Sequence, residues 1–345
     1  MTREVKIGNI AIGGTNRIAI QSMLSRPARD IEGNVYQAVQ LEEAGCDINR
    51  VSVPNEEAVQ LIPLIKDATT IPLVADIHFD YRLAIKSVEA GVDKIRFNPG
   101  NIGSFDNARR VVDCCKQHMI PIRVGVNAGS LEKDILERYK QPTPEALVES
   151  AMRHVKLIED CSYDRIVISI KSSDIRVMIE AYRMLSHSCD YPLHLGVTEA
   201  GTKEIGTIKS AIGIGTLLLE GIGDTFRVSL TDDPIAEIAA AKSILKSLDM
   251  TDEVQVISCP TCGRTEIDIV SIAKEVEQRT KHIEKKIKVA VMGCVVNGPG
   301  EASSADIGIA GGKDSALLFK KGKPIRKITA DYVDEIVKEV EEWQG

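Results

Sequence analysis

Three cysteines in the last quarter of the sequence have the spacing of a metal centre. Cys259 and Cys262 form a Cys-Pro-Thr-Cys-Gly motif, which directs two thiols to one side of a tight turn. Cys294 follows 32 residues after Cys262, beside a glycine that lets the backbone approach a bound group. Glu301, seven residues further on, offers an oxygen ligand. The remaining cysteines lie in apolar or helical stretches and are interpreted as packing residues: Cys46, Cys114, Cys115, Cys161 and Cys189.

Three kinds of site are compatible with this spacing. A [4Fe–4S] cluster can be held by three cysteines, which leaves one iron for a substrate or for a ligand other than cysteine. A zinc site needs a fourth ligand, for which His282 lies at an awkward range. A dithiol redox pair would use Cys259 and Cys262 alone. The spacing favours the cluster and leaves the other two open.

A second group of candidate residues is mostly basic and follows the ends of strand-like runs. Cations concentrated in a chain of net charge −7 favour an anionic ligand, and the arginine fork matches the oxygens of a phosphate. Any one arginine near a strand end is more often a surface ion-pair partner or a filler of the barrel mouth, so the prediction depends on the whole set. The polar residues at these ends include Arg50, Asp76, His78, Arg96, Arg123, Asn127, Lys171, His194, Glu199, Arg227 and Ser229.

The elements that carry these residues predict a (β/α)₈ barrel over residues 1–250. Apolar, β-rich runs recur at an average spacing of 28 residues between Arg17 and Gly213, with helix-period segments between them. Such runs are typical of parallel strands buried on both faces, and a barrel places their carboxyl ends at one mouth. A doubly wound open sheet is the alternative. The eight runs are 17–23, 47–54, 71–79, 93–101, 120–130, 164–173, 191–201 and 213–224.

Residues 251–345 predict a smaller α+β domain, because the βα repeat stops and the three cysteines begin. The expected elements are strands over 254–259 and 287–294, a helix within 266–286, a hairpin around 311–315, and a closing helix over 327–343 that Thr329 or Asp331 would cap.

Composition excludes several classes of protein. A net charge of −7 and an aromatic content of 4% argue against nucleic-acid binding through a basic surface or through base stacking. The sequence shows neither a signal peptide nor an apolar run long enough to cross a membrane. We therefore expect a cytoplasmic protein that binds neither nucleic acid nor membranes.

The sequence resembles the 4-hydroxy-3-methylbut-2-enyl diphosphate synthase family over essentially its whole length. CPTCGRTEID at 259–268 and MGCVVNGPGEA at 292–302 carry the resemblance in the smaller domain, and IRFNPGN, IRVGVNAGSL and GIGDTFRVSL carry it in the barrel. The resemblance implies a TIM-type barrel joined to an iron–sulfur domain similar to half of a sulfite reductase. It also implies reductive ring opening and dehydroxylation of 2-C-methyl-D-erythritol 2,4-cyclodiphosphate in the methylerythritol phosphate route to isoprenoids.

The resemblance further implies roles for single residues. Glu199 would be an acid/base, and Glu301 would occupy the fourth iron of a [4Fe–4S] cluster until substrate displaces it. Flavodoxin or ferredoxin would supply electrons, and a head-to-tail homodimer would join the barrel of one subunit to the cluster domain of the other. The implied cluster ligands are Cys259, Cys262 and Cys294, and the implied substrate ligands are Arg50, Arg96, Arg123, Asn127, Lys171, Ser229 and Asn297.

Two other functions remain as alternatives. A phosphate-ligand barrel joined to a structural zinc module would be a binding or regulatory protein. A barrel aldolase would use Lys171 as a Schiff base, for which neighbouring arginines would have to keep the amine neutral.

Overall fold

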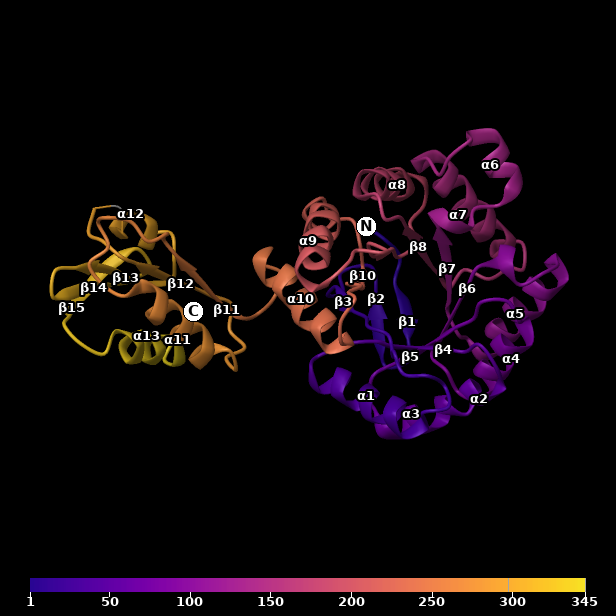
Figure 1. The fold of residues 1–345 in the computed structure, drawn as a ribbon, viewed down its shortest axis with the longest axis horizontal. Helices are drawn as coiled ribbons and strands as arrows, with labels where there is room; N and C mark the ends of the chain where they lie inside the picture. Colours follow the sequence, from indigo (N-terminus) through magenta and orange to yellow (C-terminus); the bar gives the residue numbers. More distant parts are fainter. Residues whose placement is uncertain (297, 345) are drawn as a thin grey trace. The chain divides into compact units, whose positions relative to one another are not determined.

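The chain forms two compact units in the computed structural model, which describes residues 1–296 and 298–344. Residues Met1–Ile244 make up the first unit and Leu245–Gly345 the second (Figure 1). None of the helices in the described ranges is both long and apolar enough to cross a bilayer.

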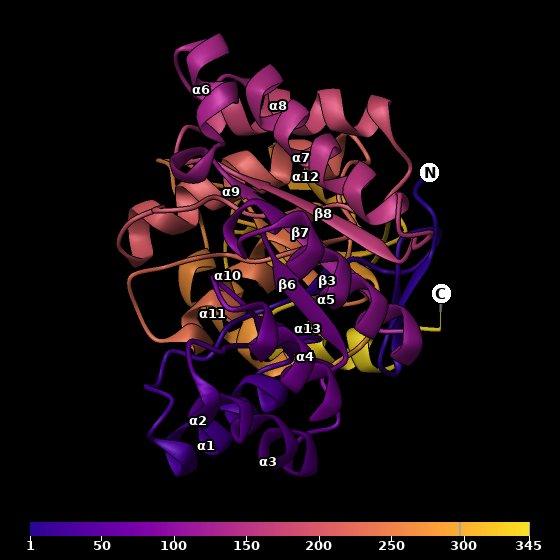
Figure 2. The same ribbon diagram turned by 90° about the vertical axis from the view of Figure 1, so that its right-hand side faces the viewer.

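The first unit is the predicted barrel. Parallel strands β4 to β8 pair in chain order, and β10 pairs with both β3 and β9. Isolated bridges from Gln21 to Ile48 and from Ile168 to Leu193 join the two sheets into a closed ring. Figure 2 shows β6, β7 and β8 side by side. The strands are β3 (Ala19–Ile20), β4 (Asn49–Ser52), β5 (Leu73–Asp76), β6 (Lys94–Phe97), β7 (Ile122–Asn127), β8 (Ile166–Lys171), β9 (His194–Leu195) and β10 (Thr225–Phe226).

Helices surround this ring on the outside (Figure 1). Several begin at a polar cap, because the side chains of Asp80, Ser104, Thr143 and Asp174 accept hydrogen bonds from backbone N–H groups of the first turn. The helices are α1 (Ile31–Glu43), α2 (Glu56–Val59), α3 (Leu61–Ala68), α4 (Tyr81–Glu89), α5 (Phe105–His118), α6 (Lys133–Tyr139), α7 (Pro144–Glu159), α8 (Ile175–Ser188), α9 (Lys203–Leu219) and α10 (Pro234–Ser247), with 3₁₀ turns at Pro99–Asn101 and Ala128–Ser130.

A tyrosine side chain helps to close the barrel between β8 and β9. The backbones of these strands meet at the Ile168–Leu193 bridge. Beyond that bridge, the hydroxyl of Tyr182 on α8 accepts a hydrogen bond from the N–H of Ile170 at 3.0 Å. The same hydroxyl donates to the carbonyl of His194. The Tyr182 hydroxyl therefore lies between the two strands and joins them.

An antiparallel hairpin of β1 (Val5–Ile7) and β2 (Ile10–Ile12) precedes the barrel, and the sequence analysis did not predict it. Ile7 and Ile12 are fully buried in a cluster with residues from the first halves of the barrel strands. The hairpin thus closes the amino-terminal end of the barrel. The barrel side of this cluster consists of Ala19, Ile48, Val74 and Val167.

The predicted eighth strand over 213–224 is wrong. Residues up to Leu219 belong to α9, and the eighth strand is β10, which begins at Thr225. A Cβ at Gly213 would lie 2.8 Å from Met178 Cε and 3.0 Å from Val197 Cγ2. Glycine at this position therefore lets α9 pack closely on its neighbours. In the sequence, glycines beside an apolar run are typical of the turns at the ends of a strand, which is why a strand was predicted here.

The second unit is a sheet with helices on both faces. Strands β11, β12 and β13 are parallel, and β13, β14 and β15 form an antiparallel meander. Helices α11 and α13 cover one face and α12 the other (Figure 1). The elements are β11 (Val254–Ser258), α11 (Ile269–Thr280), β12 (Ile287–Met292), α12 (Gly298–Ala302), β13 (Ile307–Gly312), β14 (Ser315–Lys320), β15 (Lys323–Ile328) and α13 (Tyr332–Glu341).

The closing helix is shorter than predicted. Residues 327 and 328 belong to β15, a strand that the sequence analysis missed, and α13 begins at Tyr332. Asp331 is the N-cap residue, but it has a φ of 53° and its side chain accepts no capping hydrogen bond from the residues described. Strand β15 lies at the edge of the sheet and pairs with β14, so most of its residues are exposed and several are basic. Its sequence therefore lacks the apolar alternation by which a strand is recognised.

Candidate functional site

Two arginines share one buried carboxylate at the carboxyl end of the barrel strands. Arg50 Nη2 on β4 lies 2.5 Å from Asp76 Oδ2, and Arg96 Nη1 on β6 lies 2.9 Å from Asp76 Oδ1. Burial alone would raise the pKa of Asp76, but the charges of Arg50 and Arg96 outweigh it and hold the pKa well below its usual range. His78 Nε2 lies 3.6 Å from the same carboxylate. Asp76 therefore orients both arginines while balancing only part of their charge.

Arg123 and Lys171 add positive charge to the same interior. Arg123 on β7 is 1% exposed, and its Nε and Nη1 atoms have no hydrogen-bond partner in the described part of the chain. Lys171 ends β8 and is half-buried. Burial, reinforced by Arg50, Arg227 and Arg123, lowers the pKa of Lys171. These cations are predisposed to accept an anion, because binding it would relieve their mutual repulsion.

Two glycines give these cations room. A Cβ at Gly125 on β7 would lie 2.6 Å from Arg96 Nε, so any side chain there would have to displace the guanidinium. A Cβ at Gly196 would lie 3.3 Å from Lys171 Nζ. Glycine at positions 125 and 196 therefore leaves the space that the side chains of Arg96 and Lys171 occupy.

A second carboxylate, Glu237 on α10, was not predicted. It is 2% exposed and pairs with Arg227, with Nη2 to Oε1 at 2.9 Å and Nε to Oε2 at 3.1 Å. Ser22 Oγ also donates to Glu237 at 2.8 Å. This network fixes the segment after β10, in which the half-buried Ser229 lies. No local signal marks Glu237, because only the packing of α10 turns it inward.

The remaining polar candidates of the barrel lie at the ends of their strands. Asn127 is the last residue of β7 and is half-buried. Glu199 follows β9 and is exposed, with a φ of 53°. The structure thus brings Arg50, Arg96, Arg123 and Lys171 together and places Asn127, Glu199 and Ser229 at the same end of the barrel.

Sequence reasoning also missed Lys94 at the start of β6. Its side chain is fully buried and its Nζ has no hydrogen-bond partner among the residues described. His194 on β9 is equally buried, and its Nε2 is likewise without a partner there. Burial, then the charge of Arg123, lowers the pKa of both side chains. Strand alternation was a usable signal for Lys94, since it lies two residues before Arg96 and shares its face.

The three cysteines of the second unit line one cavity of about 120 Å³. Cys259 follows β11 and Cys294 follows β12, so the parallel strands bring them to the same edge of the sheet. The N–H of Gly293 donates to Cys259 Sγ at 3.3 Å, and Thr265 Oγ1 accepts from the N–H of Cys262 at 3.1 Å. A Cβ at Gly293 would lie 2.8 Å from Thr265 Cγ2, so the close turn beside the thiols requires glycine.

The positions of the three thiols fit an iron–sulfur cluster in which each thiol would bind a different iron. The thiols come from two segments, border one cavity, and receive an N–H donor of the kind that tunes cluster sulfurs. Asn297 and the side chain of Glu301 lie outside what the structure describes, and the backbone of Glu301 is part of α12.

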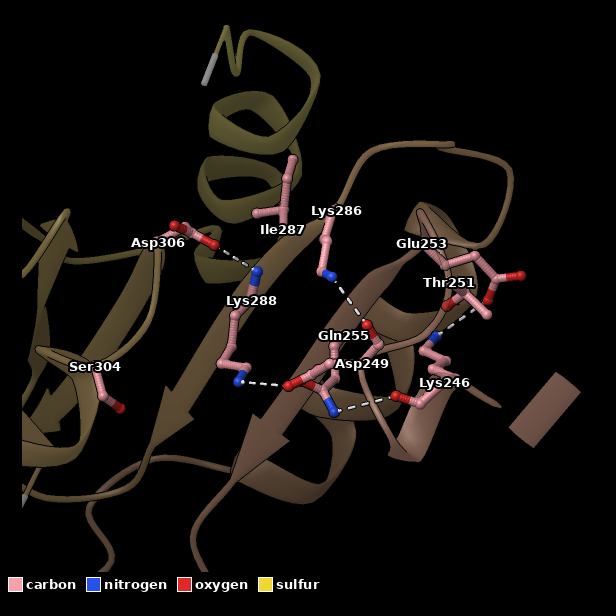
Figure 3. Close-up of a pocket in the computed structure, with 10 residues that line it drawn as sticks. All are labelled: Lys246, Asp249, Thr251, Glu253, Gln255, Lys286, Ile287, Lys288, Ser304 and Asp306. Atoms are coloured by element: carbon pink, nitrogen blue, oxygen red, sulfur yellow. Dashed lines mark hydrogen bonds and ion pairs between the residues drawn. The ribbon is translucent and has the colours of Figure 1, made fainter. Parts of the chain in front are cut away.

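A larger cavity, of about 190 Å³, lies at the other end of β11 and β12 (Figure 3). Its lysines already have partners. Lys286 Nζ donates to the carbonyl of Asp249 at 2.9 Å, Lys288 Nζ lies 3.3 Å from Asp249 Oδ2, and Lys246 Nζ lies 3.9 Å from Glu253 Oε2. The balanced charges make this cavity a weaker candidate for an anion than the barrel mouth.

Together, the fold and the two sites define a (β/α)₈ barrel with a cation-rich mouth, joined to a smaller three-cysteine domain. The chain belongs to the GcpE family: residues 2–242 match its GcpE TIM-barrel domain and residues 255–342 match the GcpE protein C-terminal domain. The family covers nearly the whole chain, so both units are included.

Two relatives of known name are similar to this chain over almost its full length. Both are named 4-hydroxy-3-methylbut-2-en-1-yl diphosphate synthase (flavodoxin). The one from Caldanaerobacter subterraneus subsp. tengcongensis is 59% identical over 343 residues, which cover 99% of this chain and 97% of the relative. The one from Clostridium perfringens is 58% identical over 342 residues, covering 99% and 98%.

Among solved structures, the dihydropteroate synthase from Xanthomonas albilineans in complex with 7,8-dihydropteroate has a TM-score of 0.52 and 15% identity. The superposed residues cover 71% of this chain and 98% of the synthase chain. At this identity the likeness shows the barrel fold alone.

Proposed function

We propose that this chain catalyses the reductive ring opening and dehydroxylation of 2-C-methyl-D-erythritol 2,4-cyclodiphosphate to 4-hydroxy-3-methylbut-2-enyl diphosphate. The observation that carries the proposal is the pairing, in one chain, of a cation-rich barrel mouth with a three-cysteine cavity. The names of the two relatives support it and favour an enzyme over a binding or regulatory protein.

The barrel mouth supplies the binding of the substrate. Each phosphate of a cyclic diphosphate carries one negative charge, and Arg50, Arg96, Arg123 and Lys171 offer charge-assisted hydrogen bonds to its oxygens. Asn127 and Ser229 would contribute uncharged donors. The buried Asp76 keeps Arg50 and Arg96 in place before the substrate arrives, which reduces the entropy lost on binding.

The reaction needs two electrons, and a [4Fe–4S] cluster held by Cys259, Cys262 and Cys294 would supply them singly while its remaining iron acts as a Lewis acid. The chain's own contribution there is to place three thiols around one cavity and to direct an N–H group at one of them. Glu301 would serve as the oxygen ligand, Asn297 would contact the substrate, and Glu199 would move a proton at the barrel mouth.

We further propose that reduced flavodoxin delivers the electrons and that the enzyme is a head-to-tail homodimer. The relatives' names support the donor. In the homodimer, the barrel of one subunit would face the cysteine domain of the other, so that each site draws on two chains.

An anaerobic preparation tests the proposal. We expect a brown protein with about four iron and four sulfide per chain, which converts the cyclodiphosphate when reduced flavodoxin is present. Cys262→Ser should lower the iron content and abolish turnover, whereas Cys114→Ser on the barrel helix α5 should change neither. A colourless protein that contains stoichiometric zinc and does not turn over the substrate would contradict the proposal.

A further inference from the structure

The barrel interior contains a layer of polar side chains that includes two arginines of the mouth and continues toward the start of the strands. Among the described residues, atoms of Gln21, Arg50, Lys94, Arg123 and His194 are buried there without hydrogen-bond partners. Buried polar atoms are nearly always paired in folded proteins, so a cluster of exceptions indicates a functional use. This layer is the strongest such cluster in the barrel.

Lys94 is the least compensated member of the layer. Its side chain is fully buried, and its Nζ has neither a hydrogen-bond partner nor an ion pair in the part of the chain described. Asp76, the buried carboxylate of the mouth, is already engaged by Arg50 and Arg96. A buried ammonium without a counter-ion is strongly disfavoured.

Two arginines of the interior act on Lys94 together with its burial. Burial is the main cause that lowers the pKa of Lys94, followed by the positive charges of Arg123 and Arg50. Arginines keep their protons under all ordinary conditions, so the lysine yields first. The groups facing the interior are Arg50 on β4, Asp76 on β5, Arg96 on β6, Arg123 on β7, Lys171 on β8, His194 on β9, Arg227 after β10, and Glu237 on α10, which is paired with Arg227.

We propose that Lys94 is uncharged in the free enzyme and takes up a proton from solvent when the diphosphate binds above it, so that it completes the positive charge beneath the substrate. This inference rests on the proposed function, because the anion that triggers the uptake is the cyclodiphosphate. Lys94 is then a positioning residue that acts through Arg123 and Arg50 rather than by touching the substrate.

The charge of the ligand is the physical reason for the uptake. Two negative charges placed at the mouth attract positive charge throughout a low-dielectric interior. The arginines cannot respond, because they are already protonated. Each phosphorus of the cyclic diphosphate has one ester bond and shares the anhydride oxygen, so its single acidic oxygen is fully ionised at neutral pH and the ligand neither takes up nor releases protons. Any proton that enters on binding must therefore go to the protein.

Lys171 and His194 can also accept protons, and a variant separates their contribution from that of Lys94. Lys94→Met keeps an unbranched apolar stem and removes the amine. Because it removes an unpaired buried polar group, we expect the ligand-free variant to melt at the same or a higher temperature than the wild type. A structural role for Lys94 would instead lower the melting temperature. Lys274→Met, at an exposed position on α11, is the matched control.

Isothermal titration of the cyclodiphosphate into anaerobic holoenzyme, in two buffers of different ionisation enthalpy, measures the protons taken up per ligand bound. We expect wild type and Lys274→Met to take up about one proton more than Lys94→Met, and Lys94→Met to bind about tenfold more weakly. Equal uptake by wild type and Lys94→Met would overturn the inference and leave the proposed function intact. Failure of the wild type to bind the cyclodiphosphate would contradict the proposed function and this inference together.

Discussion

Asp76 determines the charge balance of the barrel mouth at the level of single residues. It is 1% exposed and is the counter-ion of both Arg50 and Arg96. Removing one partner of a buried ion pair leaves the other uncompensated, which costs about 3 kcal/mol or more. We expect Asp76→Asn to lose about that much free energy of unfolding at neutral pH, measured with urea and circular dichroism. Glu56→Gln, which breaks the exposed pair with Lys86, should cost less than about 1 kcal/mol.

The pH dependence of this difference has a defined sign. The pKa of Asp76 is lowered in the folded state, so its stabilising effect is complete above the ordinary carboxyl value of about 3.9 and is lost as the pH falls below it. Wild type and Asp76→Asn should therefore converge in stability in acid. A difference that grew as the pH fell would contradict the assignment of Asp76 as a charged partner.

Gly125 offers a test of positioning without loss of charge. A Cβ there would lie 2.6 Å from Arg96 Nε and 2.8 Å from Arg96 Nη2, so Gly125→Ala must displace the guanidinium. We expect the KM for the cyclodiphosphate to rise about tenfold, with a smaller change in melting temperature. Gly215→Ala on α9, where a Cβ meets nothing within 4 Å, should leave the KM unchanged and stabilise the helix slightly. A wild-type KM for Gly125→Ala would argue against a role for Arg96.

Sequence reasoning at the residue scale worked where chemistry and spacing coincide. The basic residues Arg50, Arg96 and Arg123 follow a regular strand pattern, and the structure places them together. Glu237 could not be predicted, because a carboxylate on an amphipathic helix usually faces water and only the seating of α10 buries it beside Arg227.

Among the elements, the β1–β2 hairpin allows the most specific prediction about stability. Ile7 is fully buried against the amino-terminal end of the barrel. Ile7→Ala should lower the free energy of unfolding by about 3 kcal/mol, because it removes buried methyl groups and leaves a cavity. Ile31→Ala on α1, at a position that is 40% exposed, should cost less than about 0.5 kcal/mol. Equal effects of the two substitutions on urea unfolding would show that the hairpin is not part of the folded core.

The elements that sequence reasoning missed have physical causes in common. The segment over 213–224 combines apolar residues with glycines, which favours a strand, but the glycines serve the close packing of α9. Strand β15 is mostly exposed and basic, so its periodicity carries no apolar face. Both errors arise because tertiary packing, rather than local propensity, decides the conformation. The first seven predicted barrel runs each contain a parallel strand of the structure.

For the whole molecule, the proposed homodimer predicts that two inactive variants restore activity when they are combined in one dimer, which a site built from a single chain would not do. If each site joins one subunit's barrel to the other's cysteine domain, Cys294→Ser and Arg123→Ala homodimers should both be inactive. A mixed heterodimer contains one site with neither substitution. Co-expression with two affinity tags, followed by a turnover assay, should then restore up to about half of the wild-type activity per dimer. Inactive heterodimers that contain their full iron would contradict a shared site.

Tyr182 has a consequence for how the barrel wall is held between β8 and β9. Its hydroxyl joins the two strands beyond the point where their backbones meet, with Lys171 at the end of one strand and His194 on the other. Tyr182→Phe would keep the buried ring and remove both hydrogen bonds, so the N–H of Ile170 and the carbonyl of His194 would each lose this partner. The continuity of the barrel at this seam therefore depends on one hydroxyl group from the helical layer as well as on strand pairing.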